Sequence, residues 1–477
     1  MGKIKALHLD KWIGYGLLGL YLIAAVVLVI LCININIFPF TYIAILSIIL
    51  AIIAVGFAIM HLRTIPSFIA SGLSIIFIVG LIFGTIFVSK TSSTLTELST
   101  VKGSSNTVSV YVLDEDPAQK VEDIAGYTVG ILKTTGRENT NKAISEVESS
   151  IGSSLSIKEY DNMSMLNDLK KKEIGAVIVN DAFIGMASDA ERYEWVSGGL
   201  RILATYSFEV ENAPEVVAPD DLPETFVLYL SGIDTFGDIT ARSRSDVNIL
   251  AVVNTRTKNM LLLSTPRDSY VSYSVTGGAK DKLTHAGIYG VDASIDALEK
   301  LYDINIDYYL RVNFTGFVEI IDALGGVEVY SDYDFTVQNI RDYHVGYNQV
   351  TGIEALAFAR ERYSFAAGDF QRAKNQMEVI RAVISKATSA SMLANYTTVM
   401  DAIGKNFNTN MPEDQLTSLI RMQLQDMAPW NITSYTTNGT SRSAETYSMP
   451  GQQLYVIDLD QNAINQAKDL IRQVIDN

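Results

Sequence analysis

The chain has 477 residues, 48% of them hydrophobic, and a formal net charge of −16 at pH 7. This length exceeds that of an ordinary single domain, and a mean hydropathy of +0.18 is high for a soluble protein. The acidic balance argues against a nucleic-acid-binding protein. The single cysteine, Cys32, excludes internal disulfide bonds and thiolate zinc sites.

The excess of apolar residues lies at the N-terminus. Three uncharged stretches approach the roughly 20 residues that a helix needs to cross a bilayer, and they predict spans at Ile13–Ile33, Phe40–Met60 and Phe68–Val88. Basic residues predict a cytoplasmic N-terminus, namely Lys3, Lys5 and Lys11 before the first span and Arg63 between the second and third. Three crossings would place everything after residue 90 outside the cell. A cleaved signal peptide is the alternative for the first stretch, but no small-residue cleavage site follows it.

Charge divides unevenly along the chain. Residues 1–90 hold five basic residues and one acid, a net charge of +4, which leaves −20 for the remainder. No direct nucleic-acid binding is therefore expected of the exterior portion. A local cluster of arginines in such an acidic portion indicates a functional site.

The exterior portion begins with a Ser- and Thr-rich stretch over residues 91–107, which predicts a linker. A small accessory α/β domain is predicted over residues 108–211, followed by a Pro-containing linker over residues 212–224. Its expected elements are strands at 108–113, 127–132 and 175–179 and helices at 139–149 and 161–172. No catalytic cluster occurs in it, and the Lys170–Lys172 run is read as a solvated helix end.

The main domain is predicted over residues 225–390 as an α/β/α sandwich, because strands and helices alternate. Strands are expected at 226–230, 248–254, 259–264 and 327–330, and helices at 291–301 and 314–324. Residues 391–477 are interpreted as the completion of this domain plus a tail, with helices at 396–407 and 415–427, a Thr-, Ser- and Asn-rich stretch at 434–448 and an amphipathic end at 462–475.

Arginines and aspartates recur together in the main domain. The motifs are Ser231-Gly-Ile-Asp234, Arg242-Ser-Arg244-Ser-Asp246, Ser264-Thr-Pro-Arg267-Asp268, Arg360-Glu-Arg362 and Gly368-Asp369-Phe-Gln-Arg372. Guanidinium groups match phosphate oxygens, and closely spaced carboxylates suit a hard divalent cation that bridges them. Their interleaving favours metal-assisted phosphoryl transfer on a pyrophosphate.

With these motifs, the chain resembles the LytR-CpsA-Psr family, closely over about residues 225–381, and within it the capsule-locus CpsA (Wzg) branch, which has three membrane spans and an accessory domain. Further motifs carry the resemblance: Lys282-Leu-Thr-His285-Ala286, Asp307-Tyr-Tyr309, Asn313-Phe-x-Gly316-Phe317, Asp322-Ala-Leu-Gly-Gly-Val327 and Gln376. The resemblance implies a domain that binds a polyprenyl pyrophosphate, holds its lipid in an apolar tunnel and moves the attached glycan phosphate onto peptidoglycan.

Residue roles follow from the resemblance by position. Asp234 and Asp246 would share one Mg²⁺ (or Mn²⁺) and, with Arg267 and Arg362, form the catalytic set. The pyrophosphate would be bound by Arg244, Arg267, Arg362 and Arg372, with Arg360 and Gln376 as further ligands. Asp369 would orient an arginine. The base that activates the acceptor hydroxyl is left open between Asp234, Asp246 and the metal alone.

Several residues also have a structural reading. Asp268 is expected to pair with Arg267, and Asp369 could simply pair with Arg372. His285 is expected to be an interior hydrogen-bonding histidine rather than a ligand or base. The chain departs from the family at Asn375, where an arginine is usual. The lipid tunnel could be lined by Ile249–Val253 with Phe314, Phe317, Ile320 and Ile321, but the sequence alone favours a plain hydrophobic core for each of them.

The leading hypothesis is a membrane-anchored phosphotransferase that ligates capsular polysaccharide to the cell wall. Its expected partners are the polyprenyl-pyrophosphate-linked glycan, peptidoglycan and the membrane, with other capsule biosynthesis proteins as further candidates. One alternative is a regulator of capsule synthesis that senses lipid-linked intermediates; the predicted cytoplasmic segments are too short for a DNA-binding module. Another is a pyrophosphatase that uses water as the acceptor.

Overall fold

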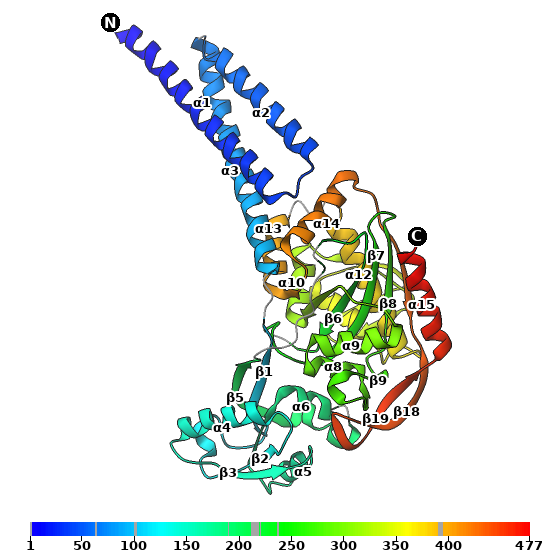
Figure 1. Cartoon of the computed structure of the whole chain (residues 1–477). Helices are drawn as coiled ribbons and strands as arrows, with labels where there is room; N and C mark the ends of the chain where they lie inside the picture. The colour runs from blue at the N-terminus through cyan, green and yellow to red at the C-terminus, as the bar shows by residue number, and fades with distance from the viewer. Residues whose placement is uncertain are drawn as a thin grey trace.

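The computed structural model describes residues 2–62, 64–99, 103–188, 190–210, 219, 221–235, 238–389 and 395–477. Figure 1 shows an anchor of long helices at one end, the main α/β domain in the middle and a smaller α/β domain at the far end. The chain runs from the anchor into the smaller, accessory domain first and then returns to build the main domain between the two.

The anchor consists of α1 (Gly2–Ile35), α2 (Phe40–Met60) and α3 (Thr64–Ser99). Among the described residues, three helices are long and apolar enough to cross a membrane, at Lys11–Ile35, Phe40–Met60 and Ser67–Ser99. The three predicted spans are therefore confirmed as apolar helices. The orientation stays a prediction, because the side chains of Lys3 and Lys5 and the whole of Arg63 lie outside the described residues.

The linker predicted over residues 91–107 is wrong for its first half, because α3 continues unbroken to Ser99. Hydroxyl side chains are accommodated by donating to carbonyls one turn earlier, as Thr91 Oγ1 does to Phe87 O at 2.9 Å. Leu95 is buried, and α3 packs along α13 (Tyr396–Asn406) of the main domain. The anchor is thus joined to the main domain by a packed helix rather than by a tether.

The accessory domain is built on a mixed sheet with strand order β3-β2-β4-β1-β5. The strands are β1 (Ser105–Leu113), β2 (Thr128–Leu132), β3 (Ser156–Tyr160), β4 (Ala176–Asn180) and β5 (Leu200–Glu209), and the helices are η1 (Val121–Ile124), α4 (Arg137–Ile151), α5 (Met165–Lys170), α6 (Asp181–Ser188), η2 (Glu191–Tyr193) and α7 (Val196–Gly199). β1 is antiparallel to β4 and β5, and β2 is parallel to β3 and β4. Because Ser105 pairs with Glu209, the first and last strands bring the two ends of this domain together.

The helix predicted over residues 161–172 is too long. Asn162 turns the chain by accepting a hydrogen bond from Ser164 N at 2.9 Å, and Lys172 adopts a positive φ of 61° just after α5. β3, α6 and β5 were not predicted. Of the linker expected over residues 212–224, residues 212–218 and 220 lie outside the described residues.

The main sheet has the strand order β16-β11-β6-β7-β8-β17. Its strands are β6 (Thr225–Ile233), β7 (Ser245–Asn254), β8 (Asn259–Ser264), β11 (Tyr308–Asn313), β16 (Phe407–Thr409) and β17 (Asn431–Thr436). β7 is antiparallel to β6 and β8, and β6 runs parallel to β11. β17 is parallel to β8, so part of the Thr- and Ser-rich C-terminal stretch forms a sheet edge.

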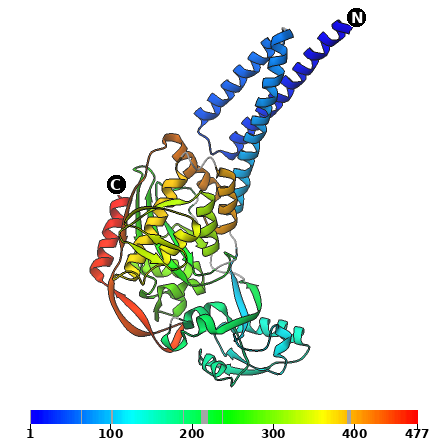
Figure 2. The same ribbon diagram turned by 180° about the vertical axis from the view of Figure 1, so that it is seen from behind.

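Helices cover both faces of this sheet. Val227 and Tyr229 of β6 pack with α9 (Val291–Tyr302) and α15 (Gln461–Ile475). The alternate residue Phe226 and its neighbours face α12 (Asp369–Ala387) and α14 (Glu413–Asp426), and Figure 2 shows α12 over that face. The predicted α/β/α sandwich is therefore confirmed.

The remaining elements decorate the sandwich. They are β9 (Tyr270–Ser272), η3 (Ser274–Thr276), β10 (Lys280–Lys282), α8 (Leu283–Tyr289), α10 (Phe314–Ala323), β12 (Val327–Ser331), β13 (Phe335–Val337), β14 (Arg341–Tyr343), β15 (Gly346–Val350), α11 (Gly352–Arg360), β18 (Gly439–Thr446) and β19 (Met449–Leu459). The predicted strand at 327–330 is present as β12, but it pairs with β15 outside the main sheet.

Candidate active site

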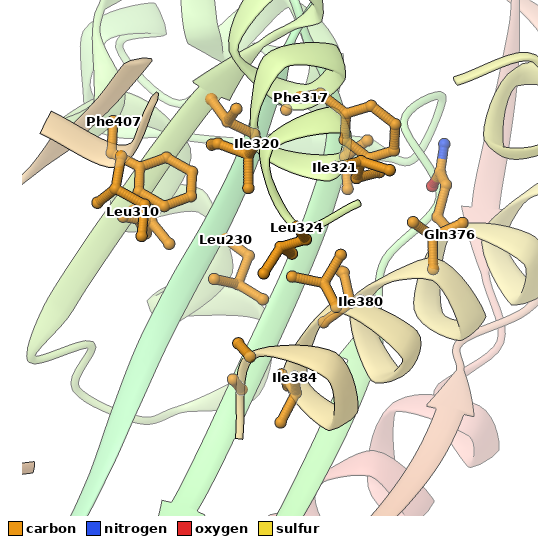
Figure 3. Close-up of a pocket in the computed structure, with 18 of the residues that line it drawn as sticks. Leu230, Leu310, Phe317, Ile320, Ile321, Leu324, Gln376, Ile380, Ile384 and Phe407 are labelled. Carbon is orange, nitrogen blue, oxygen red and sulfur yellow. The ribbon is translucent and has the colours of Figure 1, made fainter. Parts of the chain in front are cut away.

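A cavity of about 1280 Å³ lies between the main sheet and the helices α10, α12, α13 and α14. Alternate residues of β6 line it, from Phe226 through Leu228 and Leu230 to Gly232, and Asp234 follows just beyond the strand. Because a strand rises about 3.3 Å per residue, the row from Phe226 to Asp234 spans roughly 26 Å. Figure 3 shows apolar side chains from β6, β11, α10 and α12 facing one another around this space.

The end of the cavity near Phe226, here called the apolar end, meets the anchor. Phe226 packs in one cluster with α14, and Leu416, Ile420 and Leu424 of α14 pack against the anchor helices. Anchor residues form part of the lining itself: Ile35, Ile37, Phe38 and Phe87. Hydrogen bonds across this junction include those from Tyr42 Oη to Leu424 O (3.0 Å) and from Arg421 Nε to Asn36 O (2.7 Å).

The opposite end, here called the charged end, gathers the predicted site residues. The predicted phosphate and metal ligands that line the cavity are Asp234, Arg244, Asp246, Arg267, Arg360, Arg362, Arg372 and Gln376. Asp369 is outside the lining and bonds to two of these arginines. Residues scattered over the sequence thus converge in the fold as the motifs predicted; their individual roles stay predictions.

The β6–β7 pairing brings Asp234 and Asp246 to the same end. Ile233 lies opposite Ser245, with an irregular register at this point, and Asp234 N donates to Arg244 O at 3.0 Å. Arg244 Nη2 forms a short ion pair with the Asp234 carboxylate. Arg244 Nη1 donates to the carbonyl of Gly185 at 2.9 Å, so a backbone atom of the accessory domain touches the charged end.

Asp246 is held by Arg267 and Thr284. Arg267 Nη1 donates to both carboxylate oxygens, at 2.7 and 2.8 Å, and Thr284 Oγ1 donates at 3.0 Å. Burial alone would raise the pKa of Asp246, but the charges of Arg267, Arg244 and Arg372 outweigh it and hold this pKa well below its usual value. Asp246 is therefore an anion throughout the physiological pH range.

Asp369 joins two arginines at the start of α12. Its carboxylate accepts a hydrogen bond from Arg372 Nη2 at 3.1 Å and lies 3.7 Å from Arg362 Nη1. Arg362 Nη2 also donates to Tyr363 Oη at 2.7 Å. The Arg372–Asp369 pair fits both readings of Asp369, so its role in orienting an arginine stays a prediction.

Three other polar residues differ in how they meet the cavity. The guanidinium of Arg360 lies over the Phe314 ring, 4.4 Å from its centroid. Gln376 lines the cavity (Figure 3) and donates to Ala359 O at 3.3 Å. Asn375 is buried and donates to Phe358 O at 3.2 Å, tying α12 to α11. The departure from the family at Asn375 therefore falls on a packing position.

The structural readings of Asp268 and His285 are supported by their surroundings. Asp268 is buried, 2.9 Å from Lys282 Nζ and 3.6 Å from Arg267 Nε. His285 Nδ1 lies 2.7 Å from Asp281 Oδ1, and both side chains are fully buried. Neither Asp268 nor His285 lines the cavity.

The buried Lys282–Asp268 pair should matter for stability and not for ligand binding. Removing one partner of such a pair costs about 3–5 kcal/mol because it strands the other charge. We expect Lys282→Met to lower the apparent melting temperature of the full chain by roughly 10 °C, measured by thermal unfolding in detergent. Lys280→Met, on the same strand but exposed, is the control, and equal melting temperatures for the two variants would contradict this prediction.

The carboxylates of the charged end suit one kind of metal site. Among the described residues, no group of three or more His, Cys, Asp or Glu side chains is placed to hold an ion. Mg²⁺ often binds through one or two carboxylates and takes its other ligands from phosphates and water. Asp234 and Asp246 therefore fit a Mg²⁺ that binds together with a phosphate substrate, and they do not form a cage for the ion alone. Sharing of one ion by these two residues stays a prediction.

Some features of the site were not predicted. Thr284 lies in the Lys282-Leu-Thr-His285 motif, which was noted only as a family signature. The Gly185 carbonyl and the anchor residues at the apolar end carry no chemical signal in sequence. Of the residues suggested to line a lipid site, Ala251, Val253, Phe314, Phe317, Ile320 and Ile321 line the cavity, whereas Ile249, Leu250 and Val252 are core residues.

A model of the LytR_cpsA_psr family matches residues 205–470. The chain belongs to the LytR_cpsA_psr family. This confirms the resemblance seen in the motifs. The matched residues include the whole main sheet and extend into α15.

Relatives with assigned names are similar over part of their length. A polyisoprenyl-teichoic acid–peptidoglycan teichoic acid transferase, TagU of Bacillus cereus, is 40% identical over 194 residues, which are 40% of this chain and 62% of the relative. TagU of Enterococcus faecalis is 35% identical over 196 residues, 40% of this chain and 64% of the relative. The chain thus matches less than two thirds of the length of these relatives.

Solved structures are also similar to the chain. The structure described as TagT bound to LI-WTA is 28% identical with a TM-score of 0.44, covering 53% of this chain and 92% of that one. TagV of B. subtilis is 25% identical with a TM-score of 0.45, covering 53% of this chain and 98% of that one.

Proposed function

We propose that this protein is a membrane-anchored phosphotransferase that moves a glycan from a polyprenyl pyrophosphate carrier onto peptidoglycan. The observation that carries the proposal is the cavity, which has clustered guanidinium groups at one end and reaches the anchor helices at the other. A prenyl pyrophosphate is itself anionic at one end and apolar along the rest. The names of the TagU relatives, which are transferases acting between polyisoprenyl-linked teichoic acid and peptidoglycan, support the same reaction class.

In the proposed reaction, an acceptor hydroxyl on peptidoglycan attacks the phosphorus nearer the glycan. A new P–O bond to the acceptor forms, and the bond from that phosphorus to the bridging oxygen breaks. The polyprenyl phosphate leaves with the bridging oxygen, and the acceptor's proton is released to a base or to solvent. In this proposal Arg267, Arg362 and Arg372, which line the cavity, stabilise the charge that develops on the leaving phosphate.

The carboxylates already compensate the arginines of the charged end. Arg244 pairs with Asp234, Arg267 with Asp246, and Arg372 with Asp369. A Mg²⁺ or Mn²⁺ held by Asp234 and Asp246 would supply neutralisation of the phosphate oxygens and a lower acceptor pKa.

We further propose that the transferred glycan is a capsular polysaccharide and that the N-terminus is cytoplasmic. The combination of three apolar helices with an accessory domain supports the first point. The basic residues before the first span, and Arg63 between the second and third, support the second. Protection of an N-terminal tag from external protease in intact cells, with cleavage of a C-terminal tag, is expected. The reverse pattern would contradict the orientation.

Reconstitution of the full chain separates the three candidate functions. We expect the protein in lipid nanodiscs, given Mg²⁺, a lipid-linked oligosaccharide and peptidoglycan fragments, to form a covalent glycan–peptidoglycan product detectable by mass spectrometry. Chelation should abolish the product, and added Mg²⁺ should restore it. Glycan phosphate released without a peptidoglycan adduct would indicate a pyrophosphatase, and binding without turnover would indicate a sensor; either result contradicts the proposed transfer.

A further inference from the structure

The connection between β6 and β7 carries two residues of the charged end, Asp234 at its start and Arg244 at its end. The described part of this connection is hydrogen-bonded to the accessory domain at several points. The bonds are Ser105 N to Thr240 O (2.9 Å), Arg242 N to Ser105 O (2.8 Å), Arg242 Nε to Ser104 Oγ (3.1 Å) and Arg244 Nη1 to Gly185 O (2.9 Å). Ser105 also forms an isolated parallel β-bridge with Ala241.

Ser105 holds the connection with backbone atoms that its own sheet leaves available. In the β1–β5 ladder, the neighbouring bond runs from Val210 N to Ser104 O, while the N–H and C=O of Ser105 point to Thr240 and Arg242. The main domain also donates hydrogen bonds to the connection. Phe314 N donates to Thr235 O at 3.1 Å, and Arg311 Nη2 donates to Ala241 O at 3.4 Å. Ser105, the first residue of β1, therefore pairs with this connection as a residue of an adjacent β-strand would.

The accessory domain is also fixed to the main domain by apolar packing. Ile288, Met449 and Leu454 of the main domain are buried in the same cluster as Phe183 and the other core residues around α6. Met449 lies at the start of β19, beside the turn of the β18–β19 hairpin. An element packed this way has a defined position, so the carbonyl of Gly185 and the backbone of Ser105 can serve as fixed reference points.

We propose that the accessory domain positions the proposed phosphate site: Ser105 and the Gly185 carbonyl hold the β6–β7 connection so that Asp234 and Arg244 stay at the charged end. This inference rests on the proposed function. Positioning matters there because a phosphate clamp is effective only when its groups are already in place. Ser105 is accordingly a positioning residue that touches no substrate.

Ser105→Pro is the sharpest variant, because it removes the N–H that bonds to Thr240 O while leaving the Val210–Ser104 bond to β5. Ser105→Ala is the matched control, since both substitutions remove the hydroxyl that contacts Thr240 Oγ1 at 3.2 Å. Should Ser105→Pro fail to fold, Arg242→Met removes the bond to Ser104 and keeps an apolar stem.

Two measurements on the full chain in nanodiscs test the proposal. Amide hydrogen exchange reports the protection of residues 238–245, and calorimetric titration with inorganic pyrophosphate and Mg²⁺ reports the affinity of the charged end. We expect Ser105→Pro to speed exchange across residues 238–245 and to weaken pyrophosphate binding about five- to tenfold, the effect of losing one hydrogen bond. Ser105→Ala should change neither the exchange nor the pyrophosphate affinity. The apparent melting temperatures of the two variants should agree.

A double variant shows whether Ser105 acts through the charged end. If it does, Ser105→Pro should weaken binding no further in a chain that already carries Arg244→Ala. The positioning role would be overturned if the losses of affinity from Ser105→Pro and Arg244→Ala were fully additive. It would also be overturned if Ser105→Pro sped exchange but left the pyrophosphate affinity unchanged. A wild-type chain that binds no pyrophosphate contradicts the proposed function itself and the positioning role with it, while unchanged exchange in Ser105→Pro refutes only the bracing contact.

Discussion

Arg362→Ala is expected to lower the rate of glycan transfer by about 10²- to 10³-fold, as the loss of one transition-state donor typically does. The Arg362 side chain is 35% exposed, and its closest carboxylate contact is the 3.7 Å approach to Asp369. Removing it therefore leaves no buried charge uncompensated, and the apparent melting temperature should not change. Product formation by the reconstituted chain, measured beside thermal unfolding, tests both halves of this prediction.

Arg381→Ala is the matched control for Arg362→Ala, because Arg381 lies on α12 but outside the cavity lining. Arg267→Ala should also abolish transfer, yet with a loss of stability, because Arg267 is the principal partner of the Asp246 anion. Transfer by Arg362→Ala at the wild-type rate would remove this arginine from the proposed clamp.

Tryptophan substitutions along α12 are expected to shorten the longest prenyl chain that the protein accepts. Ile380 and Ile384 both line the cavity (Figure 3). With a rise of 1.5 Å per residue, they lie roughly 12 and 18 Å beyond Arg372 along the helix. A bulky ring at either position would close the cavity at that depth, so the accepted chain length should fall from wild type to Ile384→Trp and further to Ile380→Trp.

A series of prenyl pyrophosphates of increasing length, titrated against each variant, measures this order. Arg381→Trp adds the same ring one residue away from Ile380, outside the cavity lining, and should leave the wild-type preference unchanged. Inorganic pyrophosphate should bind all the variants alike, because the charged end is untouched. A uniform loss of affinity at every chain length, or the opposite order, would contradict a lipid site in this cavity.

The charged end could be predicted from the sequence because its chemistry is carried by side chains. Asp234, Asp246 and Arg267 follow or begin strands, and strands of one sheet bring such positions to a common edge. The ladder that sets Ile233 against Ser245 shows this directly. Arg372 and Asp369 are three residues apart at a helix start, where side chains of that spacing meet.

Features that depend on backbone atoms or on distant packing could not be predicted in this way. The Gly185 carbonyl is a group that every residue possesses, so nothing in α6 marks it as a partner of Arg244. The continuation of α3 to Ser99 was missed because Ser and Thr are typical of linkers, and tertiary burial of residues such as Leu95 and Leu98 outweighs that preference. The lining of the apolar end combines α1 and α3 with α14, which follows α3 by more than 300 residues in sequence.

The joint between α14 and the anchor has a consequence for where a polymer can be attached. Tyr42 and Arg421 join the anchor to the main domain at the cavity's apolar end, so the arginines of the charged end are held at a fixed distance from the anchor. They are kept at a near-constant height, set by the roughly 26 Å length of the β6 row. For the proposed reaction, only wall strands passing through that thin layer next to the bilayer would be within reach, which would restrict attachment to the innermost and most recently made material.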